Sequence, residues 1–186
     1  MDRLPPIPAD QLTEAQKSAA AEFEAARLQP VFGPFTPLLR SPELMLRASA
    51  LGDYLRYRNA LPRDVSELAI LLMSRRWTQQ YEWYVHAPDA RTAGLSADIV
   101  QAVADGRRPE RMTEDQEIVY DFSTELAEYR SVTDRTYARV VARFGERGMM
   151  DLVGVNGYYS FISMVLNVAR TPLPSGHAPA LTPFPK

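Results

Sequence analysis

Apolar residues recur along most of this chain at intervals of three and four, which is the spacing of one face of an α-helix. They seldom alternate at intervals of two, so the pattern predicts no β-strand. Glycine and proline collect between the periodic stretches, where these residues favour turns. We therefore expect an all-α protein, a helical bundle of about eight helices in a single domain.

Capping residues mark where several of these helices begin. Thr13 with Gln16, and Thr113 with Gln116, have the spacing of a capping box, and Ser41 precedes a proline that suits the first helical position. Between Pro30 and Pro37 we expect an irregular segment. The expected helices are residues 13–28, 41–58, about 62 to a turn near 77, 79–92 with Thr78 as a cap, 96–106, 113–130, 133–144 and 149–170.

The third and the last of these helices are apolar on most of their surface. Leu68, Ala69, Leu71 and Leu72 place the third at the centre of the fold. One small bundle does not comfortably hide both helices, so we expect a homo-oligomer. The single domain spans 1–186, with a core of about 40–175, an N-terminal arm and a proline-rich C-terminal tail.

Composition narrows the classes of function. The chain has no cysteine, which excludes disulfides, thiolate metal sites and cysteine nucleophiles. A net charge of −2, spread over both signs, does not form the basic face that nucleic acid requires. We see no signal peptide and no run of eighteen apolar residues, so we expect a cytoplasmic protein without a membrane partner.

The most informative residues lie between 61 and 95. Glu82 and His86 are four apart and therefore share one helix face, and Gln79 falls on the same stripe. A short turn should fold the preceding helix back, bringing Glu67 beside them. An imidazole with two carboxyl groups in unlike surroundings can supply both an acid and a base near neutral pH.

Two other interpretations of these residues stay open. A Glu–His pair at this spacing is often only a solvated pair on a helix surface. Glu67, Glu82 and His86 could also hold a metal ion, although two histidines with one carboxylate is the commoner set, and we predict no metal and no cofactor.

The same stretch resembles the alkylhydroperoxidase-like superfamily, in which a glutamate is followed by Cys-x-x-Cys, three residues and a histidine. Glu67 and His86 match the ends of this motif, while Gln79 and Glu82 replace both cysteines. The carboxymuconolactone decarboxylase family within it has Glu-x-x-x-His at this place. Further similarity covers roughly residues 40–175, and the stretches that resemble the family are 67–71, 81–83, 93–96, 158–159 and 166–174.

The resemblance implies an alkylhydroperoxidase-like oligomer, which could be a dimer, trimer or hexamer. It also implies an enzyme that moves protons on a small unsaturated lactone, carboxylate or carbonyl compound without a cofactor. His86 would be the main proton-transfer group, Glu82 would orient it and Glu67 would be a second acid. Without thiols the chain cannot be a thiol peroxidase. The alternative is a non-catalytic member that binds a small molecule or acts as a scaffold. The residues expected to contact the substrate are Gln79, Phe35, Tyr158 and Asn156.

Overall fold

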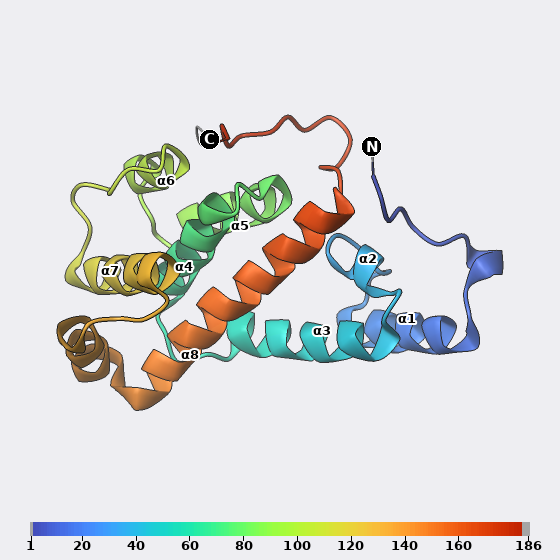
Figure 1. Cartoon of the computed structure of the whole chain (residues 1–186), viewed down its shortest axis with the longest axis horizontal. Coiled ribbons are helices and arrows are strands. Elements are labelled where there is room, and N and C mark those ends of the chain that lie inside the picture. Colours follow the sequence, from blue (N-terminus) through green and yellow to red (C-terminus); the bar gives the residue numbers. More distant parts are fainter. Residues whose placement is uncertain (1, 184–186) are drawn as a thin grey trace.

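The computed structural model describes residues 2–183, and within them the chain forms eight α-helices, one 3₁₀ helix and no strand (Figure 1). This confirms the all-α prediction. The elements are η1 (Ala9–Gln11), α1 (Glu14–Arg27), α2 (Phe35–Leu38), α3 (Pro42–Tyr57), α4 (Arg63–Arg76), α5 (Gln80–Thr92), α6 (Ala97–Ala104), α7 (Glu114–Tyr129) and α8 (Asp134–Ala169).

Local capping determines where several helices begin. α1 and α7 start with the two predicted capping boxes, in which the Thr13 and Thr113 hydroxyls accept from the backbone of the glutamine three residues later. The prediction of Thr78 as the cap of α5 is wrong. Thr78 has a φ of 46°, and Gln79 is the cap instead, with its side-chain oxygen 2.6 Å from the Tyr81 amide.

Of two other segments, one differs from the pattern expected from the sequence and one agrees with it. The proline-rich stretch expected to be irregular contains the short helix α2, where Phe35 packs against the rings of Phe23 and Phe32 at centroid distances of 4.8 and 5.7 Å. The break expected between the helices at 133–144 and 149–170 is present, because α8 consists of two helical stretches that meet at the non-helical residue Gly145 (φ 71°, ψ 173°). A residue in that backbone region cannot continue a helix, which explains the predicted break.

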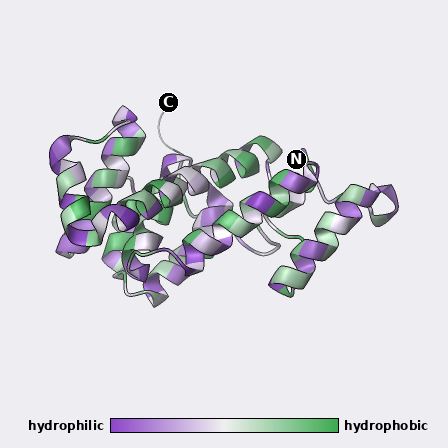
Figure 2. Cartoon of the chain, turned by 90° about the horizontal axis from the view of Figure 1, so that it is seen from below, coloured by the Kyte–Doolittle hydropathy of each residue, from purple (hydrophilic) through white to green (hydrophobic). Residues whose placement is uncertain are grey.

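Helix α4 lies at the centre of the fold, as predicted, and packs against α5, α6, α7 and α8. Its Val65, Leu68, Ala69 and Leu71 are fully buried. α8 crosses the molecule diagonally; α3 packs against it, and α1 packs against α3 (Figure 1). Figure 2 shows apolar and polar stretches on the same helices, the pattern of elements that bury one face and expose another.

The C-terminal tail returns over α5 (Figure 1). The Gln80 amide donates to the Leu181 carbonyl at 2.7 Å, and its oxygen accepts from the backbone amides of Ala180 and Leu181 at 3.0 Å. The Leu181 side chain is buried in the same apolar cluster as Trp83. This segment is therefore part of the fold and fastens α5 from outside.

Within residues 2–183, α8 is long and apolar enough to qualify as a candidate membrane span. The absence of a run of eighteen apolar residues had led us to expect no such helix. Half of its apolar window is buried against the other helices. Length and composition alone do not separate a span from the core helix of a soluble protein, so the candidate is weak evidence and the expected absence of a membrane partner stays a prediction.

We predict that Gly145→Ala lowers the free energy of unfolding by about 1–3 kcal/mol, because the φ and ψ of this residue lie in a region that is essentially restricted to glycine. Urea denaturation followed by circular dichroism measures the change. Glu146→Ala, at the exposed helical position next to it, is the control and should stay within about 0.5 kcal/mol of the wild type. Wild-type stability in Gly145→Ala would mean that the bend places no demand on this residue.

Candidate active site

The turn between α4 and α5 brings the predicted acid–base residues together. The Gln79 amide donates to the Asn167 side chain on α8 at 2.8 Å, and Asn167 donates to the Trp77 carbonyl at 3.0 Å, so the turn is held against α8. α5 then runs back along α4, placing His86 opposite Glu67. The convergence expected from the spacing of these residues is what the structure shows.

All three side chains are buried: Glu67, Glu82 and His86 are 2%, 4% and 3% exposed. A solvated pair on a helix surface would leave its carboxylate in water, so that interpretation does not describe this site. A buried carboxyl group without partners is costly, and each of these groups has the imidazole as a neighbour.

The imidazole is fixed on two sides. Its Nδ1 lies 2.8 Å from Glu67 Oε2, within hydrogen-bond distance, and its ring meets Tyr159 edge to face at 4.9 Å. Arg63 lies 3.4 Å from the other Glu67 oxygen. When Nδ1 donates to an ionised Glu67, the neutral ring leaves Nε2 without a proton and able to accept one.

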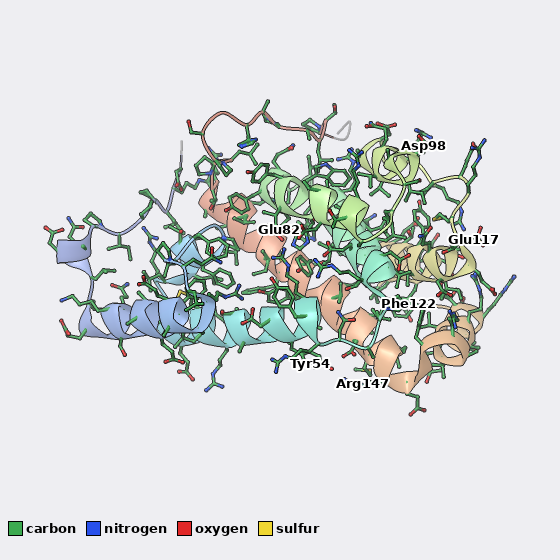
Figure 3. All side chains as sticks on the ribbon, turned by 180° about the vertical axis from the view of Figure 1, so that it is seen from behind. Tyr54, Glu82, Asp98, Glu117, Phe122 and Arg147 are labelled. Carbon is green, nitrogen blue, oxygen red and sulfur yellow. The ribbon has the colours of Figure 1, made fainter. Side chains whose placement is uncertain are left out.

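Glu82 faces that second nitrogen. Its Oε2 lies 3.7 Å from His86 Nε2, beyond a direct hydrogen bond. Burial raises the pKa of the Glu82 carboxyl; His86 and Arg56 oppose this effect, and Glu67 adds to it. Figure 3 shows Glu82 in the interior, where α5 lies beside α8. The site therefore combines a base at Nε2 with a carboxyl group that tends to keep its proton.

A cavity of about 60 Å³ opens beside these groups, where α1, α2 and α3 meet α5 and α8. Among the residues singled out from the sequence, Glu82, His86, Tyr158 and Phe35 line it, whereas Glu67 lies behind His86. This volume is enough for a few atoms beyond a bound water, so only a small reacting group fits without movement of the walls. The remaining wall residues are Arg27, Phe32, Pro34, Gly52, Asp53, Arg56, Tyr81, Val85, Tyr159 and Ile162.

Tyr158 reaches this cavity because residue 52 is a glycine. A Cβ at Gly52 would lie 2.3 Å from the Tyr158 hydroxyl oxygen, which is too close for any side chain. Because α3 and α8 approach closely at Gly52, the Tyr158 phenol can lie in the cavity wall. Burial raises the pKa of this phenol well above its ordinary value, so Tyr158 stays a neutral hydroxyl.

Two of the residues expected to contact substrate lie elsewhere. Gln79 is occupied by the cap of α5 and by Asn167, and it is not in the cavity wall. Asn156 donates to the Leu152 carbonyl within α8 and lines a different cavity, of about 260 Å³, near Trp77. We leave both residues out of the proposed site.

Sequence reasoning missed two arginines in the cavity wall. Arg27 pairs with Asp53 at 2.6 Å, and Arg56 pairs with Asp89 at 2.5 Å, while the buried Nε of Arg56 has no hydrogen-bond partner. Both come from helices far from His86 in the chain, so no local spacing marks them. Arg75 and Arg76, which are closer to His86 in the chain, lie outside this cavity.

A metal ion is conceivable at Glu67, His86 and Asp89, whose potential ligand atoms lie within 4.8 Å of one another. This differs from the set weighed from the sequence, because Asp89 takes the place of Glu82. Arg63 contacts Glu67 and Asp89, and Arg56 contacts Asp89. A cation would have to compete with these two guanidinium groups, so the ligand set fits a metal poorly.

The chain matches no family model, and no curated protein matches it. The assignment of function therefore rests on the geometry described above.

Glu82→Gln should become more stable relative to the wild type as the pH rises from about 4 to 8. The pKa of Glu82 is raised in the folded state, so its protonated form contributes stability below the unfolded value, about 4.3, and this contribution is lost as the pH rises through the folded pKa. Thermal unfolding across this range measures it.

Glu22→Gln, on the exposed face of α1, serves as the comparison for the general effect of removing a carboxyl group. A difference between Glu82→Gln and the wild type that stays constant with pH would show that burial does not hold the proton on Glu82.

Proposed function

We propose that this protein is a cofactor-independent acid–base enzyme, a decarboxylase, lyase or isomerase acting on a small unsaturated lactone, carboxylate or carbonyl compound. The observation that carries the proposal is the burial of His86 between two buried carboxyl groups at the edge of a cavity. Groups with shifted proton affinity in an enclosed hollow are typical of active sites.

The contacts of each residue indicate its role in the proposed reaction. His86 lines the cavity, and its Nε2, the nitrogen that Glu67 does not hold, takes a proton from a carbon next to the carbonyl group of the substrate. Glu82, which burial favours in its protonated form, returns a proton to the electron-rich product of that step. Glu67 touches no substrate; it holds the imidazole by its Nδ1 and stabilises the cationic ring that forms. The contacts thus favour the reverse of the roles that the resemblance implied for Glu67 and Glu82.

The resemblance to the carboxymuconolactone decarboxylase family supports this proposal. Glu67, Glu82 and His86 match the positions of the motif in sequence, and they meet on the α4–α5 pair. We extend the proposal to an alkylhydroperoxidase-like fold and to the class of reaction, in which conjugation in the substrate accommodates the electrons. Hydration, dehydration or isomerisation of an activated carbonyl compound would use the same residues.

A second candidate is a non-catalytic protein that binds a small molecule or acts as a scaffold. It is favoured by the ion pairs that already engage the charged groups around the cavity: Arg27 with Asp53, and Arg56 with Asp89. In that case the network would mainly hold α1, α3 and α5 together, and the exchange of Glu82 or His86 would alter stability alone.

Replacing His86 by Ala should abolish turnover, with a loss of at least about 100-fold in kcat, because the proton-transfer group is removed. Assays with unsaturated lactones, enol acids and related carbonyl compounds measure this, and circular dichroism checks the helix content. His177→Ala is the matched control, since His177 contacts Tyr84 at the exposed tail and should leave activity unchanged. Full activity in His86→Ala would eliminate the histidine as the base.

We also propose that the chain forms a homo-oligomer through the outer face of α8. In the part of this helix after Gly145, four large apolar side chains remain at least 36% exposed in a single copy: Met150, Val153, Met164 and Val168. Their spacing of three, eleven and four residues keeps them near one helix face. An exposed apolar stripe of this kind on a long helix is typical of a contact with another chain.

Size-exclusion chromatography with light scattering should therefore give a mass that is a multiple of 20.9 kDa. Met164→Glu should shift it toward the monomer, because the carboxylate would be buried without a partner in the interface. Leu28→Glu, at a position 91% exposed beyond the end of α1, is the control and should leave the mass unchanged. A monomeric wild type would contradict the proposed assembly.

A further inference from the structure

A second cavity lies where α4 meets α6 and α7. It has a volume of about 130 Å³, and it shares no wall residue with the cavity beside His86. Leu72, Met73 and Val103 give it apolar walls. It is roughly twice as large as the first cavity, so it can hold a small organic molecule as well as water.

The charge around this cavity is unbalanced. Arg75, Arg76 and Arg107 line it, and no acidic residue does within the described part of the chain. Asp105 lies nearby and pairs with Arg107 at 2.9 Å. Arg76 donates to the Ala127 carbonyl at 3.0 Å, an acceptor without a full negative charge. An anion in the cavity would meet an excess of positive charge.

Arg75 adds to this excess from inside the protein. Its side chain is buried, with 6% of the residue exposed, and it donates to the Thr78 hydroxyl at 3.2 Å. Burial lowers the pKa of the Arg75 guanidinium, and Asp105 opposes this effect. Keeping the Arg75 guanidinium charged inside the protein therefore costs hydration free energy. An anionic ligand beside it would offset part of that cost.

Ser123 supplies a polar contact that the fold leaves unused. It is fully buried, it lines the cavity, and its hydroxyl has no hydrogen-bond partner. Ser74, on the neighbouring helix and equally buried, instead donates to the carbonyl of Ile70 one turn earlier at 2.9 Å. A buried hydroxyl without a partner is unfavourable, and a ligand oxygen in the cavity would give Ser123 one.

We infer that this cavity binds a small organic anion. Its acidic group would accept hydrogen bonds from Arg76, Arg107 and the Ser123 hydroxyl, and its apolar part would pack on Leu72 and Val103. This inference does not depend on the acid–base chemistry at His86, because the two cavities are separate.

Titration of the ¹⁵N-labelled full-length protein with benzoate tests the inference, and benzamide is a neutral probe of nearly the same shape. Benzoate should shift the backbone amides of Tyr120 and Thr124, which line this cavity, and benzamide should not. Inorganic phosphate separates the two parts of the proposed ligand, and it should bind at least tenfold more weakly than benzoate because it lacks the apolar part.

Arg76→Gln and Ser123→Ala should each weaken benzoate binding about tenfold, since each removes one hydrogen bond to a charged group. Arg91→Gln removes the same charge from an exposed position on α5 and is the control; it should bind benzoate like the wild type. Ser123→Ala removes only a buried hydroxyl that has no partner, so it should still fold.

Any of three affinity results would overturn the inference. They are equal binding of benzoate and benzamide, phosphate binding as tight as benzoate, or unchanged affinity in Ser123→Ala and Arg76→Gln. Shifts at Tyr81 and Val85 alone would place the anion beside His86 and would overturn it too. His86→Ala should keep the benzoate response at Tyr120, whatever its effect on turnover, so a failure here is distinguishable from a failure of the proposed enzyme.

Discussion

The contact between Glu67 and His86 is the interaction on which the site depends. Each group loses its hydration when α4 and α5 pack together, and the 2.8 Å hydrogen bond between them offsets part of that loss. The contact also fixes the register of the two helices, because a shift of one residue would turn either side chain away. Orientation of the imidazole and pairing of the helices therefore have the same physical cause.

The cavity joins two structural units. α4 and α5 supply the groups that exchange protons, while α1, α2 and α3 supply aromatic and cationic walls, with Tyr158 and Tyr159 of α8 between them. Arg56 on α3 connects the units through its ion pair with Asp89 on α5. Arg27 holds the first unit together, since its guanidinium lies over the ring of Phe35 at 4.9 Å and pairs with Asp53 on α3. The site is complete only when the first three helices are docked on α8, so its chemistry and the tertiary fold are coupled.

The features that could be predicted from the sequence are those that depend on residues close together in the chain. Helical period and capping boxes act within a few positions, so most helices were found, and the spacing of Glu82 and His86 was enough to place both on one face. The cap at Gln79 was missed because the favourable residue type, Thr78, instead adopts a left-handed conformation in a tight turn. Arg27 and Arg56 were missed because only tertiary packing brings them to His86. The same packing places Asn156 at another cavity, so it does not line the one beside His86.

The attachment of the tail to Gln80 links order in two distant parts of the chain. Gln80 opens the helix that carries Glu82 and His86, and Leu181 shares an apolar cluster with Trp83 one turn further on. Detachment of the tail would expose the Gln80 amide and the Trp83 ring to water. We therefore expect the start of α5 to fray and the tail to detach together, as one cooperative local unfolding. Whatever binds or cuts residues 171–183 would thereby change the rigidity of the helix that holds the imidazole, without touching the cavity itself.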